Sequence, residues 1–226
     1  MSDEFIAESH EALLGNMADI ALVQRVINNS FQREFDLLSE YELNNLPSKI
    51  ISHDAFGSYD LFNGKLKKFA FRQTSIAELK KLTVWNKNSQ YCWLLGQAYE
   101  RFEKFIFASH KLLLGEKPKK EALHHSLSFF SSTYPEIKKC EERNASGIHL
   151  KIAVLMIEQL RHHIVHAQGC VNDFDEFSNK IFKNSGINNN KSEHKEFFQQ
   201  FVLDDKVYLL ERPITDECDL HRHHDI

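Results

Sequence analysis

The stretch from Gln90 to Leu114, QYCWLLGQAYERFEKFIFASHKLLL, decides the fold class of this chain. Its larger apolar residues recur at spacings of three and four positions: Tyr91, Leu94, Leu95, Ala98, Phe102, Phe105 and Leu112. Because an α-helix repeats every 3.6 residues, this spacing gathers the apolar side chains on one face. The stretch therefore predicts a long amphipathic helix that packs against other helices.

The same periodicity extends over most of the chain. Residues 3–45 predict one or two long amphipathic helices, which end at NNLPSK, where asparagines and a proline follow. Residues 54–84 predict shorter helices, separated at Gly57 and Gly64. Further helices are expected at about 119–131, 134–143 and 147–166.

The C-terminal part predicts shorter elements. VNDFDEFSNKIF offers an aspartate as the N-cap of a short helix, and VLDDKVYLL predicts two short strands around an Asp-Asp turn. The expected fold is all-α, a helical bundle with long antiparallel helices and a small C-terminal β-hairpin. We expect a single domain over residues 1–226, with a helical extension (1–50), a bundle (90–200), and a hairpin and tail (201–226).

The cysteine pattern and the apolar segments indicate the cellular compartment. The four cysteines, Cys92, Cys140, Cys170 and Cys218, form no CxxC pair, which indicates reduced thiols rather than a zinc site or a disulfide framework. The N-terminal MSDEFIAESH lacks the apolar segment of a signal peptide, and the longest apolar run, IAVLMI, is too short to cross a bilayer. We expect a soluble, cytoplasmic protein with no membrane partner.

The net charge of −4 hides an uneven distribution. Residues 1–60 carry 11 acidic and 3 basic side chains, whereas residues 61–199 carry 22 basic and 14 acidic ones. A local basic patch can bind a polyanion on an acidic protein, because salt screens exposed charges beyond about 10 Å. If residues 61–84 are helical, Lys65, Lys68 and Arg72 share a face and are candidates for binding RNA. The alternative is an ordinary solvated helix surface.

A second stretch, EQLRHHIVHAQG (158–169), ends the helix expected at 147–166 and is rich in histidine. At 100° per residue, Ala153, Met156, Leu160 and Ile164 form the apolar face, and His163 lies at its edge. The opposite face carries Glu158, Arg161, His162 and His166. Gly169 is placed to end the helix in a left-handed conformation.

Three interpretations of this polar face remain open. His162 and His166 have the i,i+4 spacing of a zinc helix, but His163 replaces the usual glutamate and no third ligand is evident, so no metal is assigned. Histidine moves protons near neutral pH and arginine binds phosphate oxygens, which together suit cleavage of RNA without a cofactor. The third interpretation is a purely structural face that packs against a partner helix.

The residues RHHIVH resemble the signature of HEPN domains (higher eukaryotes and prokaryotes nucleotide-binding). The signature is an arginine, here Arg161, a polar residue directly after it, here His162, and a histidine after four intervening residues, here His166. The similarity covers about residues 155–175, and the helical pattern over 90–200 fits the family's bundle. Many members are metal-independent endoribonucleases in toxin–antitoxin, abortive-infection, CRISPR and other antiviral defence systems, and they dimerise so that two motif helices share one cleft.

This resemblance implies roles for the cluster. His166 would move protons between the ribose 2′-hydroxyl and the leaving 5′-oxygen, and Arg161 would bind the scissile phosphate. His162 would orient Arg161, position the phosphate or share proton transfer, and Glu158 would support His162 or Arg161. The expected partners are RNA, such as tRNA or another single-stranded or loop RNA, a second copy of the chain, and an antitoxin or regulatory protein. The alternative is a catalytically silent HEPN dimer that binds a protein or a nucleotide.

Overall fold

The computed structural model describes residues 2–46, 48–115 and 122–211. Contacts along the chain group it into two compact units, Met1–Phe105 and Ile106–Ile226. The division into one domain with an N-terminal extension and a C-terminal hairpin and tail stays a prediction. The tail itself, residues 212–226, lies outside the described residues.

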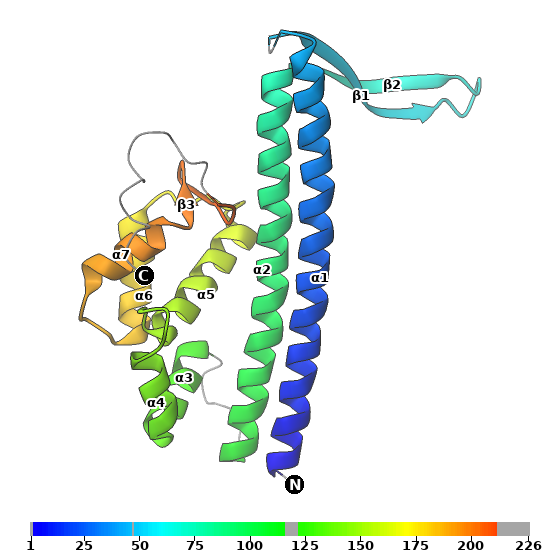
Figure 1. The fold of residues 1–226 in the computed structure, drawn as a ribbon. Coiled ribbons are helices and arrows are strands. Elements are labelled where there is room, and N and C mark those ends of the chain that lie inside the picture. The colour runs from blue at the N-terminus through cyan, green and yellow to red at the C-terminus, as the bar shows by residue number, and fades with distance from the viewer. Residues whose placement is uncertain (1, 47, 116–121, 212–226) are drawn as a thin grey trace. The chain divides into compact units, whose positions relative to one another are not determined.

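The first unit contains two long antiparallel helices with a β-hairpin inserted between them (Figure 1). The helices are α1 (Ser2–Leu43) and the part of α2 (Ile76–Leu114) that ends at Phe105; the strands are β1 (Ile50–Tyr59) and β2 (Leu66–Ser75). At one end of the pair the rings of His10 and Phe105 lie 6.0 Å apart. The expected helices over 3–45 and 90–114 are thereby confirmed, and the first is continuous.

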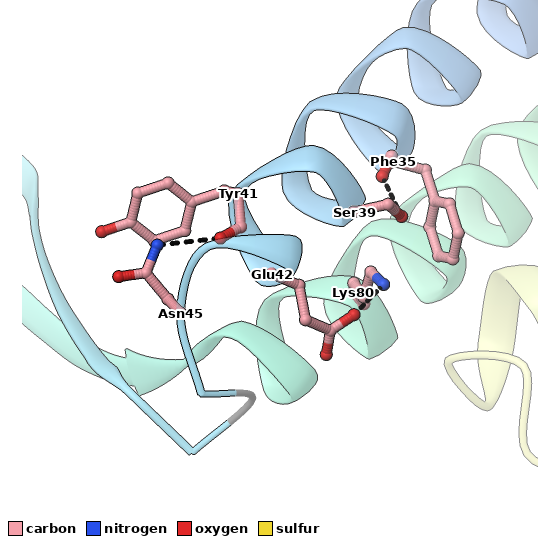
Figure 2. Close-up of polar contacts among 6 residues, drawn as sticks. All are labelled: Phe35, Ser39, Tyr41, Glu42, Asn45 and Lys80. Carbon is pink, nitrogen blue, oxygen red and sulfur yellow. Dashed lines mark hydrogen bonds and ion pairs between the residues drawn. The ribbon is translucent and has the colours of Figure 1, made fainter.

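At the other end of the helix pair, an ion pair joins α2 to α1 (Figure 2). The Nζ atom of Lys80 lies 2.5 Å from a carboxylate oxygen of Glu42 and 5.1 Å from the centre of the Phe35 ring. Just beyond α1, the Asn45 side-chain amide donates to the carbonyl oxygen of Tyr41 at 2.8 Å. These contacts fix the point where the chain leaves α1 toward the strands.

The prediction of short helices over residues 54–84 is wrong for residues 54–75. β1 and β2 pair antiparallel, from Ile50 opposite Ser75 to Tyr59 opposite Leu66. The loop that joins them turns at Gly64, whose φ of +66° is the left-handed conformation that glycine adopts without strain. From residue 76 onward the segment is helical, as expected, because it forms the start of α2.

The second unit contains the end of α2, five shorter helices and a two-stranded hairpin. The helices are α3 (Leu123–Thr133), α4 (Pro135–Glu142), α5 (Leu150–His166), α6 (Phe174–Ser185) and α7 (Lys191–Gln199). The strands are β3 (Val202–Leu203) and β4 (Lys206–Val207). The predicted all-α fold with a small C-terminal hairpin is confirmed, and β1–β2 is an additional strand pair that the periodicity did not predict.

Large apolar side chains form the core of the second unit. On α5, Met156 and Leu160 are buried as the sequence predicted, whereas Ala153 and Ile164 are half-buried. On α6 and α7, aromatic rings stack around Phe198, which lies 5.7 Å from Phe182 and is fully buried. Burying one such side chain contributes about 1.5–3 kcal/mol, which is why these helices hold together despite their short length.

The C-terminal hairpin has the expected Asp-Asp turn. Val202 pairs with Val207 and Leu203 with Lys206, and the two turn residues, Asp204 and Asp205, have φ values of +50° and +57°. Positive φ at both central positions is the geometry that matches the right-handed twist of a two-residue hairpin.

The described cysteines carry free thiols. Among the described residues Cys92, Cys140 and Cys170 are free, and only Cys92 is fully buried. Burial raises the pKa of the Cys92 thiol to about 11. No helix in the described part of the chain is both long and apolar enough to span a bilayer.

Candidate functional site

The candidate site lies at the C-terminal end of α5. The helix ends at His166, and the next residues turn sharply because Gln168 and Gly169 have φ values of +53° and +80°. The amides of Ala167 and Gly169 both donate to the carbonyl oxygen of His163, at 2.9 Å each. The predicted left-handed ending at Gly169 is therefore confirmed.

The C-terminal hairpin holds the segment that follows this turn. The Val207 amide donates to the Gly169 carbonyl at 2.8 Å, and the Val171 amide donates to the Asp205 carbonyl at 2.7 Å. A β-bridge between Cys170 and Lys206 completes the pairing. Backbone hydrogen bonds on both sides thus fix the chain directly behind the last turn of α5.

His163 is a structural residue of this turn. Its Nδ1 atom donates to the carbonyl oxygen of Cys170 at 2.6 Å, and its ring meets Phe177 of α6 edge to face at 5.7 Å. The side chain is half-buried, as expected for a residue at the edge of the apolar face. These contacts leave the neighbouring His162 and His166 as the histidines that face solvent.

His162 and His166 form an exposed pair of rings. Their centroids lie 4.9 Å apart with the ring planes inclined by 49°. Both side chains are exposed to solvent. The i,i+4 spacing on α5 produces this pairing directly.

Cations surround His162. Burial of the imidazole lowers the pKa of His162 below 6.5, and the charges of Lys180, His166, His163 and Arg161 lower it further. Lys180 belongs to α6 and is exposed. Sequence reasoning missed it, although it follows Phe177 by three positions and so lies one turn along α6 from the contact with His163. The residues around Lys180 in the sequence do not indicate this proximity, because only the packing of α6 on α5 brings Lys180 close to His162.

The sequence predicts that Glu158 and Arg161 also point away from the core, and the structure confirms this only in part. Glu158 and Arg161 are half-buried, not fully exposed like His162 and His166. α5 is helical throughout to His166, so the five-residue separation places Arg161 and His166 about 140° apart around its axis. One protomer therefore presents the arginine and the histidine in different directions.

The predicted basic patch has a different structure from the one expected. Lys68 and Arg72 lie on strand β2, where their backbones pair with Gly57 and His53, so the shared helical face that suggested the patch does not exist. Lys65 lies in the loop before β2, is exposed, and accepts a hydrogen bond from the Asp60 amide on its carbonyl oxygen. All three belong to the first unit, whereas the α5 cluster belongs to the second.

Metal-ligating side chains do not cluster in the described residues: no group of three or more His, Cys, Asp or Glu side chains there could hold a metal ion. His162 and His166 therefore lack a third ligand within this part of one protomer. The arrangement suits a different role, which is to hold an anion between imidazoles and cationic side chains.

Comparison of the chain with models of known protein families, with curated proteins and with solved structures finds no match.

Proposed function

We propose that this protein is a metal-independent endoribonuclease whose active centre is formed by Arg161, His162 and His166. The observation that carries the proposal is the exposed pair of histidine rings, 4.9 Å apart, beside Arg161 and Lys180. Two imidazoles next to permanent cations are the elements needed to transfer protons around a phosphodiester. The resemblance of RHHIVH to the HEPN signature points to the same chemistry and to a toxin or antiviral-defence role.

RNA is the substrate that this chemistry fits. RNA carries its own nucleophile, the 2′-hydroxyl, which attacks the adjacent phosphorus when a base removes its proton. The bond from phosphorus to the 5′-oxygen breaks, and an acid protonates that oxygen. The products are a 2′,3′-cyclic phosphate and a 5′-hydroxyl end. DNA lacks the 2′-hydroxyl and is not cleaved, and flexible single strands or loops reach the in-line geometry more readily than a duplex.

Each residue has a distinct task in this reaction. His162 is suited to accept the proton, because its lowered pKa keeps the imidazole neutral at pH 7. His166, on the adjacent ring, returns a proton to the leaving oxygen. Arg161 stabilises the charge that develops on the phosphate oxygens, and Lys180 binds the phosphate from α6. Glu158 supports Arg161 from three positions earlier on α5.

The geometry of α5 favours a centre shared by two protomers. Arg161 and His166 point about 140° apart on one regular helix, which disfavours a single phosphate between them within one chain. A two-fold axis beside α5 would place Arg161 of one protomer opposite His166 of its partner. We therefore propose that the active form is a homodimer.

The test is cleavage of total cellular RNA and of a matched DNA in EDTA by the wild type, Arg161→Ala and His166→Ala. Each substitution is expected to reduce the rate about 100-fold or more, because it removes a transition-state cation or a proton donor. Lys183→Ala is the matched control, since this exposed lysine of α6 is not among the charges that act on His162. Cleavage that both variants retain, with folded dimers verified, would place the active centre elsewhere.

One observation favours the catalytically silent alternative, in which the cluster binds a regulatory protein or a nucleotide. Arg161 and Glu158 are half-buried, which also suits residues that stabilise the helix end. In that case Arg161→Ala would lower the melting temperature clearly, and the wild type would cleave none of the RNAs offered.

A further inference from the structure

A polar cleft lies at the opposite end of α5 from the candidate active centre. It has a volume of about 660 Å³, and it is lined by the loop after α6, Gly186–Asn190, together with Glu142, Gly147, His149 and His194. A smaller cavity of about 280 Å³ shares Glu142, His149 and Ile187 with it, and adds Lys151. Every residue of the cleft belongs to the second unit.

Two helices begin at this cleft. His149 is the N-cap residue of α5 and Asn190 is the N-cap residue of α7, and both line the cleft. Neither the His149 nor the Asn190 side chain makes a capping hydrogen bond to the amides of its helix. The first amides of a helix need acceptors, and the helix dipole makes them favour negative charge. Two such ends at one cleft are a site for an anion.

Two imidazoles at the cleft also need partners. His194 is 6% exposed, and the Nδ1 atoms of His194 and His149 are buried without a hydrogen-bond partner in the described part of the chain. A buried polar atom without a hydrogen-bond partner destabilises the fold. A ligand group that reaches either Nδ1 atom would supply the missing hydrogen-bond partner.

The smaller cavity beside the cleft contributes a lysine, Lys151, whose hydrogen bonds go to neutral groups. The Glu141 carboxylate accepts a hydrogen bond from Ser131 at 2.6 Å, and Glu142 lies 3.9 Å from Lys138. Lys151, in contrast, donates only to neutral acceptors, the Ser128 hydroxyl and a backbone carbonyl. Burial lowers the pKa of Lys151, and Glu141 partly offsets that effect. An anion near Lys151 would favour its charged form.

We propose that this cleft binds a small phosphate monoester through its phosphate group. The first turns of two helices and two imidazoles border the cleft, and Lys151 lines the smaller cavity beside it. A tetrahedral phosphate has enough oxygens to accept from several of these donors. A metal ion is disfavoured, since the described residues contain no cluster of three or more suitable ligands. The asparagines at 188–190 also line the cleft, and their side-chain amides are available to bind the part of the monoester beyond its phosphate.

This site is independent of the proposed RNA-cleaving centre. At 1.5 Å per residue, His149 and His166 lie about 25 Å apart along α5. The phosphate binds at the N-terminal end of the helix, and the histidine pair lies at the C-terminal end. Binding at the cleft is therefore measured without reference to ribonuclease activity.

The experiment is a titration of the full-length protein with inorganic phosphate and with glycerol phosphate, at constant ionic strength, followed by amide NMR shifts. Saturable shifts are expected at Gly147, Gly186 and residues 188–190. His194→Gln is expected to weaken binding at least tenfold. Lys111→Gln, which removes an exposed lysine of α2 that lines neither cavity, is the control and should leave the cleft affinity within twofold.

A second variant tests the helix end directly and does not depend on the fold tolerating a change at His194. In His149→Asp the carboxylate caps α5 itself and occupies the amides that the phosphate would use. The melting temperature should rise, and phosphate affinity at the cleft should fall at least tenfold. The proposal is overturned if the wild type shows no saturable shifts at the cleft, or if His149→Asp is stabilised yet binds phosphate as tightly as the wild type.

Discussion

At the residue scale, the chemistry of the candidate centre depends on the charges around one imidazole. Burial comes first among the causes that lower the pKa of His162, and Lys180 is the largest of the charges. A histidine that is neutral at pH 7 accepts protons, whereas a protonated one donates them. In the proposed centre Lys180 therefore has a second role besides binding phosphate, because its charge lowers the pKa of His162.

We predict that Lys180→Met raises the pKa of His162 toward 6.5, because the substitution removes the largest opposing charge. An NMR titration of the histidine ring protons measures this shift directly and needs no substrate. Lys183→Met, three positions further along α6, should leave the His162 pKa unchanged. Equal pKa shifts in both variants would mean that the overall charge of α6, rather than the proximity of Lys180, controls the pKa of His162.

His110 shows the same effect inside the second unit. It is 4% exposed, its Nδ1 atom pairs with the Ser126 hydroxyl at 2.7 Å, and its ring stacks on Phe129 at 4.5 Å. Burial lowers the pKa of His110 below its ordinary value of 6.5. As pH falls below 6.5, the unfolded chain therefore binds a proton more readily than the folded one.

The second prediction follows from the lowered pKa of His110. The contribution of His110 to the free energy of unfolding is complete above pH 6.5 and is lost as pH falls through that value toward the lowered pKa. Urea unfolding at pH 7.5 and 5.5 should therefore show a smaller loss of stability in His110→Gln than in the wild type. The exposed His125 serves as the control, and His125→Gln should lose as much stability as the wild type. If His110→Gln loses as much stability between pH 7.5 and 5.5 as the wild type, the assignment of this pH dependence to His110 is contradicted.

At the element scale, the helices were predictable because periodicity and capping are local. The helical pattern over residues 3–45, the start of α6 at an aspartate and the turn at Asp204 and Asp205 all follow from a few neighbouring residues. The pattern left open one helix or two over 3–45, and the structure has one, α1. The strands β1 and β2 were missed because Lys65, Lys68 and Arg72 were read with a helical period. Asn63-Gly64 was the available signal, since this dipeptide favours hairpin turns.

The capping aspartate of α6 provides the third prediction. Asp173 accepts a hydrogen bond from the Glu176 amide at 2.8 Å. Asp173→Ala should cost about 0.5–2 kcal/mol in urea denaturation, because that amide loses its acceptor. Asp173→Asn keeps a capping oxygen and should cost much less. Similar losses in the two variants would show that the negative charge, and not the cap, stabilises α6.

The fourth prediction is that replacing glycine by alanine has opposite effects on stability at two positions. Gly169 has a φ of +80°, whereas Gly96 is inside α2, and an added Cβ would meet no atom within 4 Å at either position. Gly169→Ala should therefore destabilise the fold by about 1–2 kcal/mol through backbone strain. Gly96→Ala should stabilise it by about 0.5–1 kcal/mol, because alanine loses less entropy in a helix. Urea denaturation of both variants measures the difference.

At the scale of the whole molecule, the candidate centre was only partly predictable. One helix carries Arg161, His162 and His166, so their order and faces follow from the sequence. Lys180 comes from another helix, and the bond from His163 to Cys170 depends on the C-terminal hairpin. Long-range packing of this kind leaves no local pattern. The half-burial of Arg161 likewise depends on what packs around α5, which the helical period alone does not determine.

The central claim is that two protomers complete one active centre, and a mixing experiment tests it most directly. Arg161→Ala and His166→Ala proteins are unfolded and refolded together, and RNA cleavage in EDTA is compared with each variant alone. If one chain supplies the arginine and its partner the histidine, half of the dimers are mixed and each has one intact centre. Statistical mixing should then restore about a quarter of wild-type activity. If the mixture is as inactive as its components while the wild type cleaves RNA, the shared centre is wrong.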